Sequence, residues 1–133
     1  MLTVGDTLPN FALTAVNGTD PKTAFQPATP ADYAGKWLVI VAWPKDFTFV
    51  CPTEIIGFDG LARDFADRDA QLLGLSTDSD FVHLAWRQSR ADLGKVSYPW
   101  LADIKRELSS ALGILDKGEG VCLRATFIVD PRA

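Results

Sequence analysis

The chain has 133 residues, 47% hydrophobic and 23% charged, so we expect residues 1–133 to form a single globular domain. A net charge of -4 without a cluster of Lys and Arg excludes the usual nucleic-acid-binding pattern. No apolar run reaches the roughly 20 residues that span a bilayer, and no signal peptide is visible, so we expect a cytoplasmic protein with no membrane partner. One histidine and two distant cysteines predict neither a metal site nor another cofactor.

The first predicted elements are a loop, a strand and a helix. Residues 17–30 are rich in Thr, Pro, Gly and Ala and predict a surface loop. Residues 37–43 form a short apolar run with β-branched and aromatic side chains, which predicts a buried strand that stops at Pro44. We expect a helix to begin at Cys51, because the proline after it suits a first turn and apolar residues recur at helical spacing as far as Phe65.

The second half of the chain repeats this alternation. Residues 71–76 predict a strand, and Ser79 can cap a helix over residues 79–90. The side chains expected on the buried face of that helix are Val82, Ala85 and Trp86. After a loop at residues 98–100, Asp103 can cap a short helix that ends at Gly113. Residues 125–129 predict another buried strand, halted by Asp130 and Pro131.

Cys51 lies where chemistry is expected in such a chain. Alternating strands and helices predict an α/β sheet with helices on its faces, and the working site of such sheets lies where a strand ends and a helix begins. Helix N–H groups and the helix dipole favour a thiolate at this position. Position alone leaves the alternative of an unreactive capping or buried thiol open.

The residues around Cys51 carry a family resemblance. Pro44, Thr48 and Cys51 resemble the peroxidatic motif of the peroxiredoxins, Pro-x3-Thr/Ser-x2-Cys. The string DFTFVCPTEI is similar to the alkyl hydroperoxide reductase C and thiol-specific antioxidant branch, the typical two-cysteine peroxiredoxins. Similar strings follow as STDS at 76–79, HLAW at 83–86, DIKREL at 103–108 and RATFIVDP at 124–131. The resemblance therefore covers most of the chain from Trp37 onward.

The resemblance implies a thioredoxin-like fold, in which a central mixed sheet is flanked by helices. It implies a thiol-dependent peroxidase that reduces hydrogen peroxide and organic hydroperoxides through a cysteine sulfenic acid, in antioxidant defence. Cys51 would be the peroxidatic cysteine, Thr48 would offer its hydroxyl to the thiolate and the peroxide, and Pro44 would shield the sulfur from water. Arg124 would be the active-site arginine, with Glu54 helping to position it.

Partners are also implied. An external dithiol, either a thioredoxin-like protein or an alkyl hydroperoxide reductase partner, would restore the thiol, and the chain would form a homodimer or a ring of dimers. Family members continue past the Asp-Pro turn with a strand, a helix and a tail that carries the resolving cysteine, whereas this chain ends at residue 133. We therefore expect the C-terminal part of the family fold to be absent, and a missing tail or a partner chain to cover the sheet edge.

Cys122 is the remaining candidate for the resolving thiol. It lies two residues before Arg124, so in a strand the two side chains would share a face. The alternative is a packed, non-catalytic thiol. For His83 and Trp86 we expect structural roles: His83 hydrogen-bonds or faces solvent, and Trp86 packs in the core or the wall of the site.

Two other functions remain open. A thioredoxin-like protein disulfide oxidoreductase would need a Cys-x-x-Cys pair, but the segment reads Cys51-Pro52-Thr53-Glu54. A peroxiredoxin-like holdase chaperone or redox sensor would not depend on turnover at Cys51.

Overall fold

The computed structural model describes residues 2–48 and 51–132, and at Cys51 it describes the backbone alone. The strands are β1 (Leu13–Val16), β2 (Phe25–Ala28), β3 (Trp37–Ala42), β4 (Ala70–Ser76), β5 (Trp100–Ala102), β6 (Leu115–Asp116), β7 (Val121–Cys122) and β8 (Ala125–Val129). The helices are the 3-10 helix η1 (Pro30–Tyr33), α1 (Cys51–Asp59), α2 (Ala62–Asp67), α3 (Asp80–Ser89), α4 (Ala91–Gly94) and α5 (Glu107–Ala111).

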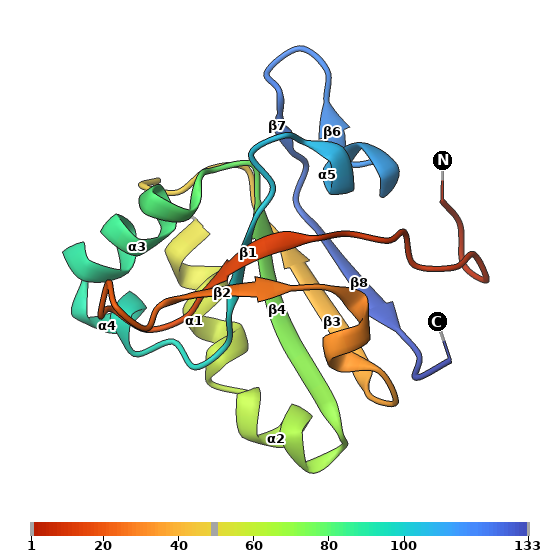
Figure 1. The fold of residues 1–133 in the computed structure, drawn as a ribbon, viewed down its shortest axis with the longest axis horizontal. Helices are drawn as coiled ribbons and strands as arrows, with labels where there is room; N and C mark the ends of the chain where they lie inside the picture. Colours follow the sequence, from red (N-terminus) through yellow and green to blue (C-terminus); the bar gives the residue numbers. More distant parts are fainter. Residues whose placement is uncertain (1, 49–50, 133) are drawn as a thin grey trace.

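Six of these strands form one mixed sheet in the order β2-β1-β5-β4-β3-β8 (Figure 1). β3, β4 and β5 run parallel, while β1 and β8 pair antiparallel to their neighbours. The two short strands β6 and β7 pair antiparallel and lie with α5 at one end of the sheet (Figure 1). The predicted α/β architecture is therefore confirmed. Because β3 and β4 are parallel, the segments that follow them lie at the same end of the sheet, beyond the carboxyl ends of the strands.

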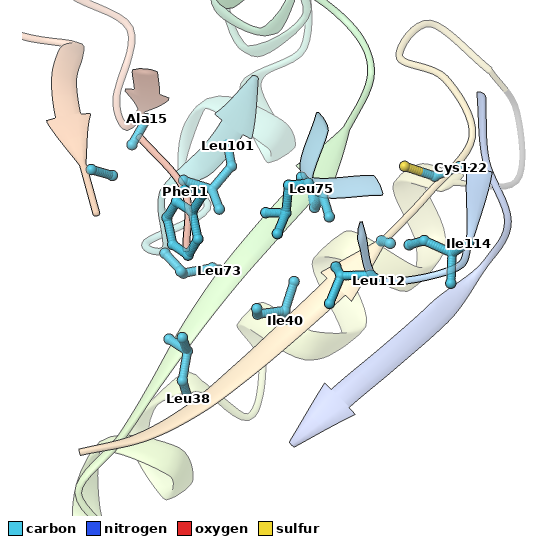
Figure 2. Close-up of a cluster of buried hydrophobic side chains, with 13 residues drawn as sticks. Phe11, Ala15, Leu38, Ile40, Leu73, Leu75, Leu101, Leu112, Ile114 and Cys122 are labelled. Carbon is cyan, nitrogen blue, oxygen red and sulfur yellow. The ribbon is translucent and has the colours of Figure 1, made fainter. Parts of the chain in front are cut away.

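Both faces of the sheet are covered, and β3 shows how. Leu38, Ile40 and Ala42 point into a cluster that includes Leu108 of α5, while Val39, Val41 and Trp43 point into a second cluster. The helical members of that second cluster are Ile55 of α1, Trp86 of α3 and Leu93 of α4. Figure 2 shows the first cluster, in which Leu73 and Leu75 of β4 pack near Ile40. A strand buried on both sides explains the uninterrupted apolar run of its sequence.

Three expectations about strands are corrected. Residues 17–30 are not all loop, because β2 lies within them and pairs with β1. Neither of these two strands was predicted from the sequence. Pro27 in β2 is tolerated because β2 is an edge strand. Trp100 begins β5 instead of ending a loop. β8 was predicted to be buried, yet it is an edge strand whose side chains alternate between half-buried and exposed, with Ile128 71% exposed.

The predicted helices are confirmed with changes. The expected helix from Cys51 to Phe65 is divided into α1 and α2 near Gly60. Ser79 caps α3 as predicted, since its Oγ accepts a hydrogen bond from the Val82 N–H at 3.2 Å. Of the three residues predicted on the buried face of α3, Trp86 is confirmed, whereas Ala85 is exposed and Val82 only half-buried. The residues buried there are His83, Leu84, Trp86 and Arg87.

Asp103 stabilises the start of α5, although that helix begins later than predicted. Its carboxylate accepts hydrogen bonds from the backbone N–H of Leu108 at 3.2 Å and of Ser109 at 2.6 Å. Arg106, at φ 63°, turns the chain between the carboxylate and the helix. Among the residues that the structure describes, no helix combines the length and apolar character required to cross a membrane.

Candidate active site

The predicted nucleophile lies at a helix start. α1 begins at Cys51, shortly after the loop that follows β3, as the sequence predicted. Pro52 occupies the first turn, where its missing N–H costs no hydrogen bond. Glu54 places a carboxylate in the same turn. The side chain of Cys51 lies outside the described residues, and the groups around it define the candidate site.

Arg124 reaches this helix start from a distant part of the chain. It lies in a bend directly before β8, and the antiparallel register pairs Ala125 of β8 with Ala42 at the end of β3. This register places Arg124 beside the exit from β3. Its Nη1 donates a hydrogen bond to Oε2 of Glu54 at 3.0 Å, and the two side chains are 38% and 42% exposed. A guanidinium is therefore held, within reach of solvent, at the first turn of α1.

Pro44 and Thr48 lie in the loop between β3 and α1. Pro44 is half-buried at the point where the chain leaves the sheet. The half-buried Thr48 donates its hydroxyl hydrogen to the carbonyl oxygen of Lys45 at 3.3 Å. A hydroxyl rotates easily to a new acceptor. The motif residues thus share one short loop that ends near the helix start.

The same loop contains a buried carboxylate that the sequence did not reveal. Asp46 is 6% exposed, its Oδ1 accepts a hydrogen bond from Trp43 Nε1 at 2.8 Å, and its Oδ2 lies 2.5 Å from His83 Nδ1. Burial raises the pKa of Asp46, and the hydrogen bond and charge of His83 oppose that rise. His83 is fully buried, so the expectation that it hydrogen-bonds is confirmed and exposure to solvent is excluded. A lone Asp in a turn gave no sequence signal for this contact.

Cys122 lies on the other side of the sheet. It belongs to the buried cluster drawn in Figure 2, whose members include Leu108 of α5 and no residue of α1. Its side chain is 1% exposed, and burial raises its pKa to about 11. The strand that we expected to carry Cys122 and Arg124 together ends at Cys122, so the two do not share a face. The single strand on which the expected shared face depended is therefore not formed, and Cys122 is buried while the Arg124 side chain is 38% exposed.

The surroundings of Cys122 favour the protonated thiol. Its Sγ lies 3.1 Å from the hydroxyl of Ser109, which donates its own hydrogen to Asp103 at 2.5 Å. Because a hydroxyl has one hydrogen to give, the S–H of Cys122 is the donor toward Ser109. Within the part of the chain that the structure describes, no group of three or more His, Cys, Asp or Glu residues is arranged to hold a metal ion.

Comparisons with known proteins identify relatives of this chain. A family model described as the AhpC/TSA family matches residues 4–133. The alkyl hydroperoxide reductase C of Mycolicibacterium smegmatis is 51% identical over an alignment of 139 positions, which covers 98% of this chain and 71% of that protein. Peroxiredoxin-2 of Cricetulus griseus is 42% identical over 132 residues, covering 97% of this chain and 65% of that protein.

Among solved structures, the AhpC of Mycobacterium tuberculosis superposes with a TM-score of 0.91 at 49% sequence identity, covering 99% of this chain and 78% of that chain. The AhpC of Enterococcus faecalis superposes with a TM-score of 0.87 at 34% identity, covering 93% of this chain and 72% of that one. These matches confirm the thioredoxin-like fold that the motif around Cys51 implied. The chain therefore belongs to the AhpC/TSA family of peroxiredoxins, which are thiol-dependent peroxidases.

Proposed function

We propose that this protein reduces hydrogen peroxide and organic hydroperoxides with Cys51 as the attacking sulfur, in antioxidant defence. The observation that carries the assignment is the ion pair of Arg124 and Glu54 at the first turn of α1. Glu54 lies three residues after Cys51, and positions three apart are neighbours on a helix. A cation at this turn is suited to an anionic sulfur and to the negative charge that develops on a peroxide oxygen.

The proposed reaction proceeds in balanced steps. The Cys51 thiolate attacks one peroxide oxygen, a sulfur–oxygen bond forms, and the oxygen–oxygen bond breaks. The departing oxygen takes up a proton and leaves as water or an alcohol, and the sulfur is oxidised to a sulfenic acid. A second thiol condenses with the sulfenic acid, releasing water and forming a disulfide. An external dithiol supplies two electrons and two protons through disulfide exchange and restores the thiol.

Thiolate formation alone is too weak an effect for this chemistry. A thiol of pKa near 8.5 is roughly 3% ionised at pH 7, and lowering the pKa to about 6 raises that fraction about 30-fold. Nucleophilicity falls with the pKa and removes about tenfold of this gain, so a net factor of about three remains. The rest must come from groups that stabilise the transition state. We assign this role to Arg124 and Thr48, together with backbone N–H groups of α1.

The two other motif residues have supporting roles in this proposal. Pro44 would exclude water from the sulfur, because it is half-buried in the loop and has no N–H to offer. Glu54 would hold the Arg124 guanidinium in one orientation through the 3.0 Å hydrogen bond. Both roles act on the surroundings of the sulfur and need no contact with the peroxide.

The partners follow from the same chemistry. The sulfenic acid needs a thiol source, so we propose an external dithiol reductant of the thioredoxin-like or alkyl hydroperoxide reductase type. We also propose a homodimer or a ring of dimers, which is supported by the exposed edge strand β8 with its apolar Ile128. A cytoplasmic location stays a prediction that fractionation of the source cells would check.

Cys122 is better suited to packing than to resolving Cys51. Its burial, its raised pKa and its place on the opposite side of the sheet from α1 all support a packed, non-catalytic thiol. A resolving cysteine must reach the sulfenic acid, and Cys122 would first have to leave the cluster in Figure 2. We therefore propose that the thiol that resolves Cys51 comes from another chain or from the reductant.

A single substitution tests the function. Cys51→Ser should abolish peroxide consumption in the presence of a small dithiol, whereas Cys122→Ala, the matched control, should retain it. An insulin-reduction assay on the same samples tests the protein disulfide oxidoreductase alternative, and we expect no activity there. Peroxide consumption that survives Cys51→Ser at the rate of the unmodified protein would eliminate the proposed role of Cys51.

A further inference from the structure

The loop between β3 and α1 has a buried anchor between exposed neighbours. Asp46 is buried, while Lys45 and Phe47 on either side of it are exposed, Phe47 by 56%. Phe47 also adopts φ 60°, in the left-handed region that bulky residues rarely occupy. Such a conformation persists only where the surrounding contacts hold it. Asp46, the residue directly before it, is held by several such contacts, and the ring of Phe47 itself lies 5.9 Å from that of Trp86.

Three separate parts of the fold hold Asp46. Its Oδ1 accepts the indole N–H of Trp43, directly after β3, and its Oδ2 contacts His83 of α3. Its backbone N–H donates to Oδ2 of Asp78 at 2.8 Å, in the segment after β4. That Asp78 oxygen is itself fixed by the hydroxyl of Ser76 at 2.7 Å. One loop residue is thus tied to the segments that follow both strands and to the helix packed beside them.

The contact between Asp46 and His83 does not depend on which of them carries the proton. His83 Nε2 faces the carbonyl oxygen of Leu101 at 3.0 Å, so that nitrogen carries a hydrogen. One further proton then lies between Nδ1 and Oδ2, giving either imidazolium with carboxylate or imidazole with carboxylic acid. Both forms are neutral overall and both retain the hydrogen bond. A buried pair of this kind avoids an uncompensated charge, which would be costly in the core.

We propose that Asp46 is a positioning residue of the peroxidase site, which, with His83, fixes the loop that carries Pro44 and Thr48 against the start of α1. The inference rests on the proposed function, because it concerns the geometry in which Cys51 meets peroxide. Reactions that depend on alignment are sensitive to small shifts: a displacement of about 1 Å can cost on the order of 100-fold in rate. Asp46 touches no reacting atom in this scheme and acts through the loop.

Two reactions of Cys51 separate positioning from stability. Oxidation by hydrogen peroxide needs the aligned site, whereas alkylation by iodoacetamide needs only an accessible thiolate. We expect Asp46→Ala to slow oxidation on the order of 100-fold per folded molecule and to leave alkylation unchanged. A merely structural role would lower the folded fraction, measured by near-ultraviolet circular dichroism, and leave the rates of both reactions per folded molecule unchanged. Asp92→Ala, which removes the exposed ion-pair partner of Arg90, is the control and should change neither rate.

The conservative variant tests the hydrogen bonds themselves. In Asp46→Asn the amide oxygen can accept from Trp43 and the amide N–H can donate to Nδ1 of a neutral His83, so we expect most of the oxidation rate to return. If Asp46→Ala does not fold, Trp43→Phe replaces it, because it removes the indole donor and keeps an aromatic ring. We expect slower oxidation and unchanged alkylation there as well.

The results that would overturn the inference are distinct. Oxidation at the unmodified rate in folded Asp46→Ala, or in Trp43→Phe where that variant replaces it, contradicts positioning. A parallel fall in the rates of oxidation and alkylation also contradicts it. An oxidation rate of Asp46→Asn as low as that of Asp46→Ala would do the same. Lack of peroxide oxidation in the unmodified protein would instead count against the proposed function, and the inference would fail with it.

Discussion

Arg124 and Glu54 are 70 residues apart in the sequence, and their side chains meet at 3.0 Å. The antiparallel pairing of β8 with β3 brings them together, since it sets the residue before β8 beside the loop that leads to α1. Both side chains are more than a third exposed, and ion pairs of this kind contribute about 0–1 kcal/mol to stability. The pair therefore orients the guanidinium and adds little to the stability of the fold.

Arg124→Ala should slow the oxidation of Cys51 by peroxide far more than it alters the ionisation of Cys51. Loss of one group that stabilises charge in a transition state costs on the order of 100- to 1,000-fold in rate. Stopped-flow oxidation with hydrogen peroxide, compared with the pH dependence of alkylation, measures the two effects separately. Arg124→Lys is the control, because it keeps the charge and loses the planar fork that bonds Glu54. An unimpaired Arg124→Ala would refute the charge argument.

Elements with strong local signals were predicted from the sequence. The strand over residues 37–43 was visible because both of its faces are buried and its apolar run is uninterrupted. The cap at Ser79 was visible because a hydroxyl before a helical pattern has a specific role there. The start of α1 at Cys51 and the motif residues Pro44 and Thr48 were likewise accessible, since they form one short segment.

Elements that depend on distant partners were not predicted. β2 is only four residues long and contains Pro27, and it forms because it pairs with β1. The buried face of α3 contains His83, a polar residue whose partner Asp46 lies 37 residues earlier. No pattern in the neighbouring sequence predicts a contact between residues so far apart. Arg124 was identified through the family resemblance, and only the β3–β8 register explains how it reaches Glu54.

Cys122 should take no part in disulfide formation during the first turnover. It is buried on the side of the sheet opposite α1, and its S–H donates to Ser109. Mass spectrometry of peroxide-treated protein should therefore give the same disulfide pattern for the unmodified chain and for Cys122→Ala. A disulfide between Cys51 and Cys122 that disappears in the variant would show instead that Cys122 resolves the sulfenic acid.

Cys122 should also make the stability of the fold depend on pH in the alkaline range. Its pKa of about 11 in the folded protein exceeds the ordinary value of 9.0, so the native state keeps a proton that the unfolded chain releases. Stability is therefore unaffected by this group below about pH 9 and falls as the pH rises toward 11. Two pKa units correspond to about 3 kcal/mol.

The measurement is a difference between two proteins. Urea unfolding of the unmodified chain and of Cys122→Ala at pH 8 and pH 11 should show the advantage of the unmodified chain shrinking as the pH rises. Other groups that titrate in this range, such as Tyr98 with its raised pKa, are present in both proteins and cancel. A difference in unfolding free energy that stays constant with pH would contradict the assigned burial of the thiol.

Gly74→Ala should destabilise the protein, because position 74 packs against the buried rings of Trp43 and Trp100. A Cβ at position 74 of β4 would clash with a ring carbon of Trp43 and lie 2.9 Å from one of Trp100. Both rings are fully buried and cannot swing away, so the sheet or the rings must shift. Overpacking of this kind costs about 1–3 kcal/mol. The cost should appear as a lower midpoint in urea unfolding followed by tryptophan fluorescence.

The matched substitution for this test is Gly57→Ala in α1. A Cβ there meets no atom within 4 Å, and replacing glycine by alanine in a helix gains about 0.5–1 kcal/mol. The same chemical change should therefore lower stability at position 74 and raise it at position 57. Equal midpoints for Gly74→Ala and the unmodified chain would mean that the rings of Trp43 and Trp100 can move aside for a Cβ at position 74 at no cost in stability.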